Sequence, residues 1–452
     1  MFAEKSALFS GFYGGDEMME NRCNLFVVVC VLSFCNCFLM ADEWPQWRGP
    51  NRDGVWKEKG IVERLDEPEL EVVWRKEISG GYCGPTVADN RVYVMDRVVK
   101  PEQIERVLCF DAMTGEQIWS HEYECKYRKV GYPVGPRASV TIEDGRAYSL
   151  GTMGHLFCFN AANGEVVWKK DLNTEYQIRM PIWGITASPL IENDMVIVQI
   201  GGKDNACVVA FDKVSGKERW RSLDDKASYS APIVIEQAGK RVLVCWTGER
   251  IVGLNPVNGQ LYWEHPFKQT EMIINVPTPV FRDDHLFMSS FFDGSLLLKV
   301  KQNEVALEKV WRRKGKNENK TDSLHCMIST PIILGDYIYG VDSYGELRCL
   351  DLKTGDRIWE SLEAVPKARW ANIHLVEKGE NIWMFNERGE LIISKLSPEG
   401  FEEISRAKII EPTEGQLDQR GGVCWSHPAF AYKHIYVRND EELICVNLAV
   451  SK

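Results

Sequence analysis

Residues 109–119 read CFDAMTGEQIW, and residues 158–168 read CFNAANGEVVW. Three further stretches share the pattern: AFDKVSGKERW at 210–220, GLNPVNGQLYW at 253–263 and CLDLKTGDRIW at 349–359. In all five copies an Asp or Asn precedes the Trp by eight residues, and a Gly precedes it by four. A fixed offset that recurs along a chain is typical of an array of similar structural units.

Each copy predicts a β-hairpin. An apolar run precedes the Asp or Asn and a second run contains the Trp, so both runs indicate strands. The Asp or Asn side chain can accept hydrogen bonds from backbone N–H groups two or three residues later, and the Gly supplies the positive φ that the turn requires. Because side chains alternate across a strand, the fixed offset also fixes the face on which Trp lies. We therefore expect a set of structural anchors that pack between neighbouring units: Trp74, Trp119, Trp168, Trp220, Trp263, Trp311 and Trp359.

Each unit also has a second half with two more strands. An apolar strand that begins near a Pro is followed by a turn and another strand, as in PTVADNRVYVMD (85–96) and TPIILGDYIYGVD (330–342). Four short strands then make up one unit, and successive Trp anchors lie 43 to 52 residues apart. Four-stranded units of this length are typical of the blades of a β-propeller.

Three degenerate copies complete the count of blades. GSLLLKV (294–300) aligns with the first strand of the repeat but is followed by a longer turn. GELIISKLSPEGFEEI (389–404) keeps the Gly and has Ile404 in the place expected for Trp. EELICVNL (441–448) has the first strand of the repeat, but no turn and second strand follow it.

The missing strand of the last copy is present near the other end of the sequence. ELEVVW (69–74) can pair with EELICVNL, and a ring closed in this way leaves no exposed strand edge. The sequence therefore predicts an all-β fold, a single eight-bladed β-propeller with four antiparallel strands per blade, over residues 69–452. Residues 42–68 are expected to form an N-terminal clasp segment.

Residues 25–40, LFVVVCVLSFCNCFLM, form the one long apolar stretch of the sequence. The stretch is short for a membrane span, and it is followed by the small residue Ala41 and by polar sequence, which is the layout of a secretory signal peptide. We expect residues 1–41 to be a leader cleaved close to Ala41, with residues 1–17 as an over-extended start. The protein would then be exported to the periplasm or cell envelope. An uncleaved anchor and the absence of any targeting role are the alternatives.

The charge and the cysteines exclude some classes of partner and of crosslink. The formal net charge is −11 and no run is rich in Lys or Arg, so nucleic acid is not expected as a partner. Four of the fourteen cysteines lie in the leader, and four more share one repeat position that Ala210 and Gly253 fill in other copies. That position indicates a small buried slot rather than a disulfide. The pairing of the remaining six is left open: Cys83, Cys125, Cys207, Cys245, Cys326 and Cys424.

The repeat pattern (A/C)-h-(D/N)-x-x-(T/S/N)-G-x-x-x-W resembles that of the pyrroloquinoline-quinone-type, or PQQ-like, β-propellers. The quinoprotein alcohol dehydrogenases share this repeat, and so does the propeller lipoprotein of the bacterial outer-membrane barrel-assembly machinery. The opening WPQWRGPNRDG (44–54) is similar to the mature start of exported bacterial members. The resemblance extends over residues 44–450 and implies the fold. It leaves the activity open, because the repeat residues are structural ones.

The same resemblance makes pyrroloquinoline quinone with Ca²⁺ a candidate cofactor. Quinoprotein dehydrogenases hold the quinone against a disulfide between adjacent cysteines, and they bind Ca²⁺ through Glu, Asn and Asp. This sequence has no adjacent cysteines and no stretch onto which that ligand set maps. Its eight His residues form no HExxH motif or other cluster at metal-binding spacing. We therefore predict no cofactor and no metal site.

A candidate ligand site can be placed from the propeller geometry. The residues just before each inner strand lie near one mouth of the central channel, and converging aromatic and polar groups there are what a ligand site requires. Such side chains can also do no more than plug a narrow axis. The set, in ring order, is Tyr82, Cys83, Arg137, Trp183, Tyr229, Asn275, Cys326, Trp370, Trp425 and His427.

Arg137, in the stretch GPRAS, is the residue of this set best suited to hold an anionic or planar ligand, through charge and stacking together. HEYECKYRKVGYP (121–133) links the first two blades as a solvated loop or as a contact loop. We expect a monomeric, non-catalytic binding propeller for a protein partner or a small molecule. The alternative is a quinone- or metal-dependent oxidoreductase.

Overall fold

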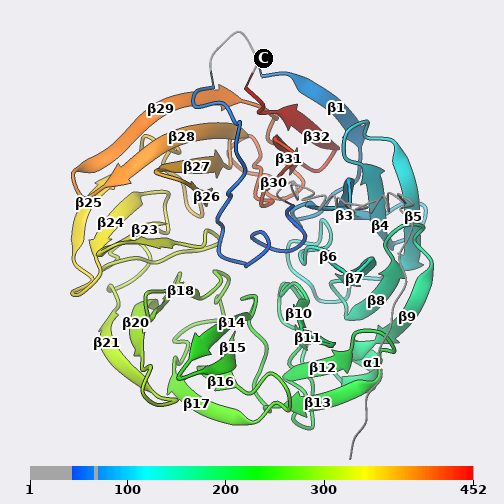
Figure 1. Ribbon diagram of the computed structural model, residues 1–452, viewed down its shortest axis with the longest axis horizontal. Coiled ribbons are helices and arrows are strands. Elements are labelled where there is room, and N and C mark those ends of the chain that lie inside the picture. Colours follow the sequence, from blue (N-terminus) through cyan, green and yellow to red (C-terminus); the bar gives the residue numbers. More distant parts are fainter. Residues whose placement is uncertain (1–42, 66–69, 451–452) are drawn as a thin grey trace, which may run out of the picture. The chain divides into compact units, whose positions relative to one another are not determined.

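The computed structural model describes residues 43–65 and 70–450. The predicted leader, its cleavage position and its four cysteines lie outside the described residues. The described residues form eight four-stranded antiparallel sheets that are arranged as blades around a ring (Figure 1). The all-β class, the eight blades and the four antiparallel strands per blade are thus confirmed. Among the described residues, no helix has the length and apolar character needed to cross a membrane.

The blades are numbered here in chain order, each from its inner to its outer strand, and one short helix, α1 (Leu172–Tyr176), follows blade 2. Blades 1 to 3 contain β2 (Thr86–Ala88), β3 (Arg91–Val98), β4 (Ile104–Asp111) and β5 (Gln117–Glu124); β6 (Thr141–Glu143), β7 (Arg146–Leu150), β8 (His155–Asn160) and β9 (Val166–Asp171); and β10 (Leu190–Glu192), β11 (Met195–Gln199), β12 (Val208–Asp212) and β13 (Glu218–Ser222). Blades 4 to 6 contain β14 (Ile233–Gln237), β15 (Lys240–Trp246), β16 (Arg250–Leu254) and β17 (Leu261–Pro266); β18 (Val280–Arg282), β19 (His285–Ser290), β20 (Gly294–Val300) and β21 (Leu307–Arg313); and β22 (Ile332–Leu334), β23 (Tyr337–Val341), β24 (Leu347–Asp351) and β25 (Arg357–Ser361). Blades 7 and 8 contain β26 (Ile373–Lys378), β27 (Asn381–Asn386), β28 (Glu390–Ser397) and β29 (Gly400–Lys408); and β30 (Ala429–Ala431), β31 (His434–Arg438), β32 (Glu442–Asn447) and β1 (Val72–Glu77).

Blade 8 is built from both ends of the described chain. Its outer strand, β1, pairs antiparallel with β32, and Trp74 lies opposite Cys445 in the register. The first and last strands therefore lie side by side where the ring closes (Figure 1). The predicted closure of the ring is confirmed, and it leaves β32 with a partner on both sides.

The turn of each of the five regular repeats packs against the preceding blade. In blade 1 the carboxylate of Asp111 accepts hydrogen bonds from the backbone N–H groups of Met113 and Thr114, as expected for this turn. Gly115 has φ +68°, and a methyl group on it would lie 2.7 Å from the ring of Trp74 in blade 8. The repeated Gly therefore serves both the turn and the close approach of a Trp. The same contact recurs in the pairs Gly164–Trp119, Gly216–Trp168, Gly259–Trp220 and Gly355–Trp311.

The indole groups also join successive blades by hydrogen bonds. In six of the seven anchors the indole N–H donates to a backbone carbonyl of the next blade, as Trp119 does to Ala161 at 2.9 Å. This geometry places the anchors between blades, and their contribution to stability stays a prediction. The other five pairs are Trp74–Ala112, Trp168–Lys213, Trp220–Pro256, Trp311–Leu352 and Trp359–Ser397.

Other contacts take this place where blade 4 meets the degenerate blade 5 and in the degenerate blade 7. The indole of Trp263 donates to the Gln237 side chain, which in turn donates to the carbonyl of Ala306 in blade 5. In blade 7 the residue opposite Ile393, where other blades have Trp, is Ser405. The prediction of Ile404 for this place was wrong by one residue, because the connection between β28 and β29 is longer: Ser405 follows Ile393 by twelve residues, whereas Trp119 follows Cys109 by ten.

The cysteines of the described residues are all buried and unpaired, which settles the six whose pairing the sequence left open. Those at the repeat position are fully buried, and Cys109, Cys158, Cys349 and Cys445 each lie opposite an anchoring Trp on the next strand. The slot is small because the indole covers it, which explains why Ala210 and Gly253 also occur there.

Residues 43–65 run across one face of the ring, drawn in blue in Figure 1. Isolated bridges join Trp44 to Val87, Val55 to Glu377 and Ile61 to Ala449, so the segment contacts blades 1 and 7 and the end of blade 8. The buried guanidinium of Arg52 donates to backbone carbonyls at Ser188, Pro189 and Pro232, just before the inner strands of blades 3 and 4. The segment therefore closes the central channel from this face.

Candidate functional site

A cavity of about 140 Å³ lies on the ring axis. Its walls come mainly from the segments that precede the inner strands β2, β6, β10, β14, β18, β22, β26 and β30, so every blade contributes to it. Each of these segments enters an inner strand at the same end, and the ring therefore brings them together at one mouth. Trp47 of the N-terminal segment lines the cavity as well, which shows that this segment closes the other side.

The structure brings together seven of the eight residues proposed for ligand binding. Those that line the cavity are Tyr82, Arg137, Trp183, Tyr229, Trp370, Trp425 and His427. That they bind a ligand stays a prediction.

Asn275 does not line the cavity, and its placement at the mouth was wrong. Its side chain is fully buried and donates to the carbonyl of Thr247, so the neighbouring Val276 faces the cavity instead. Cys83 and Cys326 are also fully buried and lie outside the lining. In these segments the chain leaves the regular alternation of a strand, so position in the sequence does not decide which side chain faces the axis.

Several lining residues are ones that the sequence analysis missed. Trp47 and Tyr132 come from outside the inner-strand segments, although both lie in stretches with unusual aromatic content, WPQWRGPNRDG and HEYECKYRKVGYP. His374 lies within β26 and not in the residues just before this inner strand, from which the candidate set was taken. Met327 and Ile328 are apolar and carried no chemical signal in the sequence.

The wall of the cavity is largely aromatic. Trp183 stacks on Tyr229 with ring centroids 4.9 Å apart. Tyr132 lies edge-on to both Trp183 and Trp370, with centroid distances of 6.1 and 6.2 Å. Rings arranged in this way offer flat apolar surfaces, on which a planar group can stack.

Arg137 is held mainly by backbone oxygens. Its guanidinium donates to the carbonyls of Gly131, Tyr132 and Gly135, and it lies 5.0 Å from the ring centre of Tyr82. No carboxylate within the described parts of the chain forms an ion pair with it. Arg137 therefore fixes the loop that carries Tyr132, and its charge at the cavity is not offset by an ion pair with any described residue.

Two polar atoms at the cavity have no partner. His427 donates from Nδ1 to the carbonyl of Pro428, and its Nε2 is buried without a hydrogen bond. The indole Nε1 of Trp370 is likewise buried and unpartnered. Buried polar groups are nearly always hydrogen-bonded, so an unpaired acceptor and an unpaired donor on one cavity favour a ligand that supplies both.

The two histidines of the cavity are neutral. Burial lowers the pKa of His374 to about 4, partly offset by its hydrogen bond to the carbonyl of Trp425. Burial also holds the pKa of His427 well below its usual value, and the neighbouring His374 lowers it further. The rings of these two residues lie 4.7 Å apart. Both therefore act as uncharged hydrogen-bonding groups at neutral pH.

The lining does not fit a quinone held together with Ca²⁺. Ca²⁺ prefers six to eight oxygen ligands, several of them carboxylates. No Asp or Glu is among the described residues that line this cavity, and no pair of cysteines faces it. The groups present can stack on a ligand and can donate and accept hydrogen bonds.

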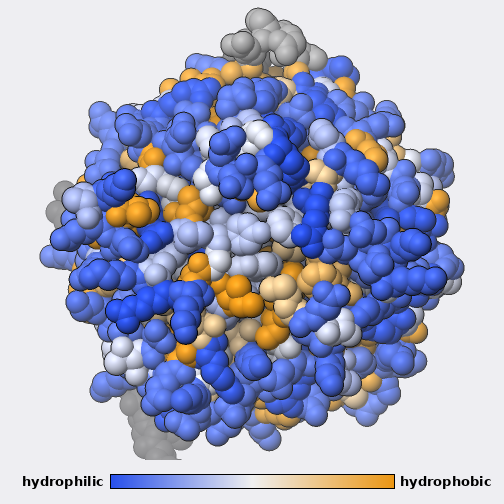
Figure 2. Space-filling model, turned by 180° about the vertical axis from the view of Figure 1, so that it is seen from behind, coloured by the Kyte–Doolittle hydropathy of each residue, from blue (hydrophilic) through white to orange (hydrophobic). Residues whose placement is uncertain are grey.

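Apolar side chains lie beside the mouth, mainly on one side of it. Figure 2 shows them gathered near the centre of the face opposite to the one seen in Figure 1. Beside the cavity, partly buried Met272, Val276, Phe292 and Ile328 pack on a small buried cluster. Ile182 is 54% exposed beside Trp183. An exposed apolar patch beside an aromatic cavity is typical of an interaction site.

Comparison with known proteins agrees with this architecture. The protein family described as outer membrane protein assembly factor BamB matches residues 103–361, which is more than half of the chain. A comparison with curated proteins found no match.

Several solved structures are similar to the propeller. BamB from Moraxella catarrhalis superposes with a TM-score of 0.57 and 16% identity, covering 85% of this chain and 99% of that one. A quinohemoprotein alcohol dehydrogenase from Comamonas testosteroni gives a TM-score of 0.60 and 12% identity, covering 91% and 81%. A europium-containing methanol dehydrogenase gives a TM-score of 0.60 and 11% identity, covering 88% and 89%. At these identities the similarity shows the fold alone.

Proposed function

The chain belongs to the family described as outer membrane protein assembly factor BamB, and from that premise we propose that it is a non-catalytic PQQ-like β-propeller that binds a protein partner or a small molecule. The observation that carries this proposal is the axial cavity, whose aromatic wall holds an unpaired donor on Trp370 and an unpaired acceptor on His427. Among the described residues, no Asp, Glu or Cys lines the cavity.

We propose that the protein acts in the bacterial cell envelope after export. The apolar stretch at residues 25–40 and the family description both support this location. The ligand or partner would place a planar, electron-rich or anionic group against Trp183 and Tyr229. The uncompensated charge of Arg137 favours such a group, and so does the hydrogen-bonding pair of the cavity.

A photo-crosslinking side chain placed at Ile182 tests the proposal in the native envelope. Ile182 is exposed beside the mouth, and Val257, which is 65% exposed in the hairpin turn between β16 and β17, is the matched control. We expect a specific adduct from position 182 that position 257 does not give. Adding Trp183→Ala should remove that adduct while the protein remains folded. Identical adducts from both positions would place the binding surface elsewhere.

The oxidoreductase alternative has its own test. The purified protein is mixed with pyrroloquinoline quinone and Ca²⁺, the excess is removed by gel filtration, and the absorption spectrum of the protein is recorded. Because the lining offers no carboxylates, we expect no stoichiometric chromophore to stay bound. A retained quinone at one equivalent per chain would favour the oxidoreductase.

A further inference from the structure

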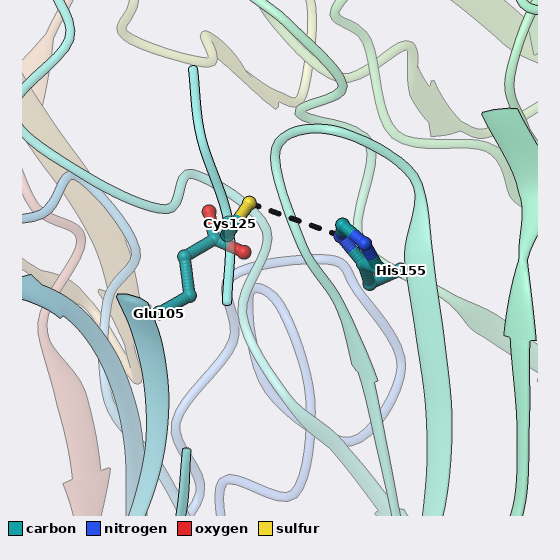
Figure 3. A group of neighbouring side chains, drawn as sticks. All are labelled: Glu105, Cys125 and His155. Carbon is teal, nitrogen blue, oxygen red and sulfur yellow. Dashed lines mark hydrogen bonds between the residues drawn. The ribbon is translucent and has the colours of Figure 1, made fainter. Parts of the chain in front are cut away.

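A second cluster of chemically reactive side chains lies between blades 1 and 2, outside the residues that line the axial cavity. Glu105 of β4, Cys125 just after β5 and His155 at the start of β8 point toward one another (Figure 3). One donor atom from each lies within 4.8 Å of the others, and Cys125 Sγ is 3.8 Å from His155 Nδ1. Glu105 and Cys125 are almost completely buried, and His155 is partly exposed.

The Glu105 carboxylate is buried without a cation. It accepts hydrogen bonds from the hydroxyl groups of Tyr123 and Tyr127 and from the backbone N–H of Thr152. Within the described parts of the chain it forms no ion pair with Lys or Arg. Arg97, which lies on the ring of Tyr127, donates to other oxygens. The hydrogen bonds satisfy the carboxylate, and its buried negative charge favours a cation placed directly beside it.

We propose that Glu105, Cys125 and His155 bind a divalent metal ion of the Zn²⁺ class. A thiolate, an imidazole and a carboxylate are the three ligand types that Zn²⁺ takes in proteins. The two negative charges of Cys125 and Glu105 neutralise the dication, so the buried assembly carries no net charge. The partly exposed side of His155 gives an ion access to the cluster.

The geometry requires only a small contraction. Tetrahedral ligands at the usual Zn²⁺ distances lie about 3.5 Å from one another. Cys125 and His155 are already close to this separation, and the Glu105 oxygen exceeds it by at most about 1.3 Å. The two tyrosine hydroxyl groups orient the carboxylate, as hydrogen-bonding partners of metal ligands do elsewhere. Three protein ligands leave a fourth position for water.

The segment that supplies Cys125 is the stretch HEYECKYRKVGYP, which the axial cavity uses only through Tyr132. Its Tyr123, Cys125 and Tyr127 all turn toward Glu105, so one loop provides a ligand together with the groups that orient another. A Cys–His pair can also act as a nucleophile and base. Cys125 is only 1% exposed, however, so a substrate cannot reach its sulfur.

Co²⁺ titration of the untagged, chelator-treated full chain tests the metal site. Co²⁺ stands in for Zn²⁺, and a thiolate ligand gives it an intense charge-transfer band. We expect one equivalent of Co²⁺ to produce this band, Zn²⁺ to displace it, and Zn²⁺ to raise the melting temperature. Cys125→Ser should abolish the band and weaken binding at least about 100-fold, since even loss of an orienting group costs 10- to 100-fold.

Cys158→Ala is the matched control. Cys158 is a buried cysteine three residues from His155, and Ala210 fills the equivalent place in blade 3, so this variant should keep the band. His155→Gln gives a second variant that should lose tight binding if Cys125→Ser does not fold. Absence of the band in the parent protein would overturn the proposal, and so would a band that survives Cys125→Ser. Neither result bears on ligand binding in the axial cavity, which does not contain these residues.

Discussion

Gly164 offers a direct measurement of the contact that joins one blade to the next. It has φ +74°, and a methyl group on it would lie 2.7 Å from the ring of Trp119 in the preceding blade. Gly145, in another turn of the same blade, has φ +68° and nothing within 4 Å of its place for a methyl group. The two residues share the backbone conformation and differ in the neighbouring indole.

The expected losses of unfolding free energy follow from these two geometries. An L-residue in the left-handed region costs about 1–2 kcal/mol, and both Gly145→Ala and Gly164→Ala incur this cost. Overpacking a buried contact adds about 1–3 kcal/mol, and only Gly164→Ala incurs it. Gly164→Ala should therefore destabilise the protein by about 2–5 kcal/mol in total. The difference between the variants reports the contact with Trp119.

Urea denaturation of both variants, followed by circular dichroism, measures these values. A double-mutant cycle with Trp119→Leu adds a second check, because the smaller side chain removes the clash and should lower the cost of Gly164→Ala to that of Gly145→Ala. Equal destabilisation by Gly164→Ala and Gly145→Ala would refute the packing role. The repeated Gly would then be needed for its turn alone.

Three further predictions concern blade contacts, closure and pH. Trp119→Phe removes the hydrogen bond to Ala161 and should cost at least about 1 kcal/mol in urea denaturation, whereas an unchanged midpoint would show the bond to be dispensable. Deletion of residues 42–75 removes the first four of the six residues of β1 and exposes the edge of β32, so size-exclusion chromatography should show aggregates. A stable monomer would contradict ring closure as a requirement. The pKa of His374 is lowered to about 4 in the folded protein, where the ring is neutral at neutral pH. As the pH falls, His374 is therefore protonated in the unfolded chain before it is protonated in the folded protein. Stability should fall by about 3 kcal/mol as the pH drops from 6.5 to 4, and His374→Asn should flatten this profile.

The sequence alone was enough to predict the propeller. The turn of each repeat is determined by residues that are close together in the sequence. The side chain of Asp111 accepts the hydrogen bonds of its turn, and Gly115 adopts the positive φ that this turn requires. The period of the repeat then determines the number of blades. Because the last repeat lacks its outer strand, the sequence also indicates that ELEVVW (69–74) completes the last blade. Local hydrogen bonds and side-chain alternation have a fixed period, so they can be read without knowing the fold. In blade 7, where a longer connection between β28 and β29 breaks that period, the residue expected in place of Trp was one position off.

The binding groups were decided by the tertiary structure. Segments before the inner strands have no regular period, so Val276 rather than Asn275 faces the axis, and the choice depends on the buried hydrogen bond that Asn275 makes. Trp47 reaches the cavity only because the N-terminal segment crosses the ring. Glu105, Cys125 and His155 follow no metal-binding spacing, and the sequence analysis predicted no metal site there. They come together because two neighbouring blades pack side by side, and that distance exists only once the ring is folded.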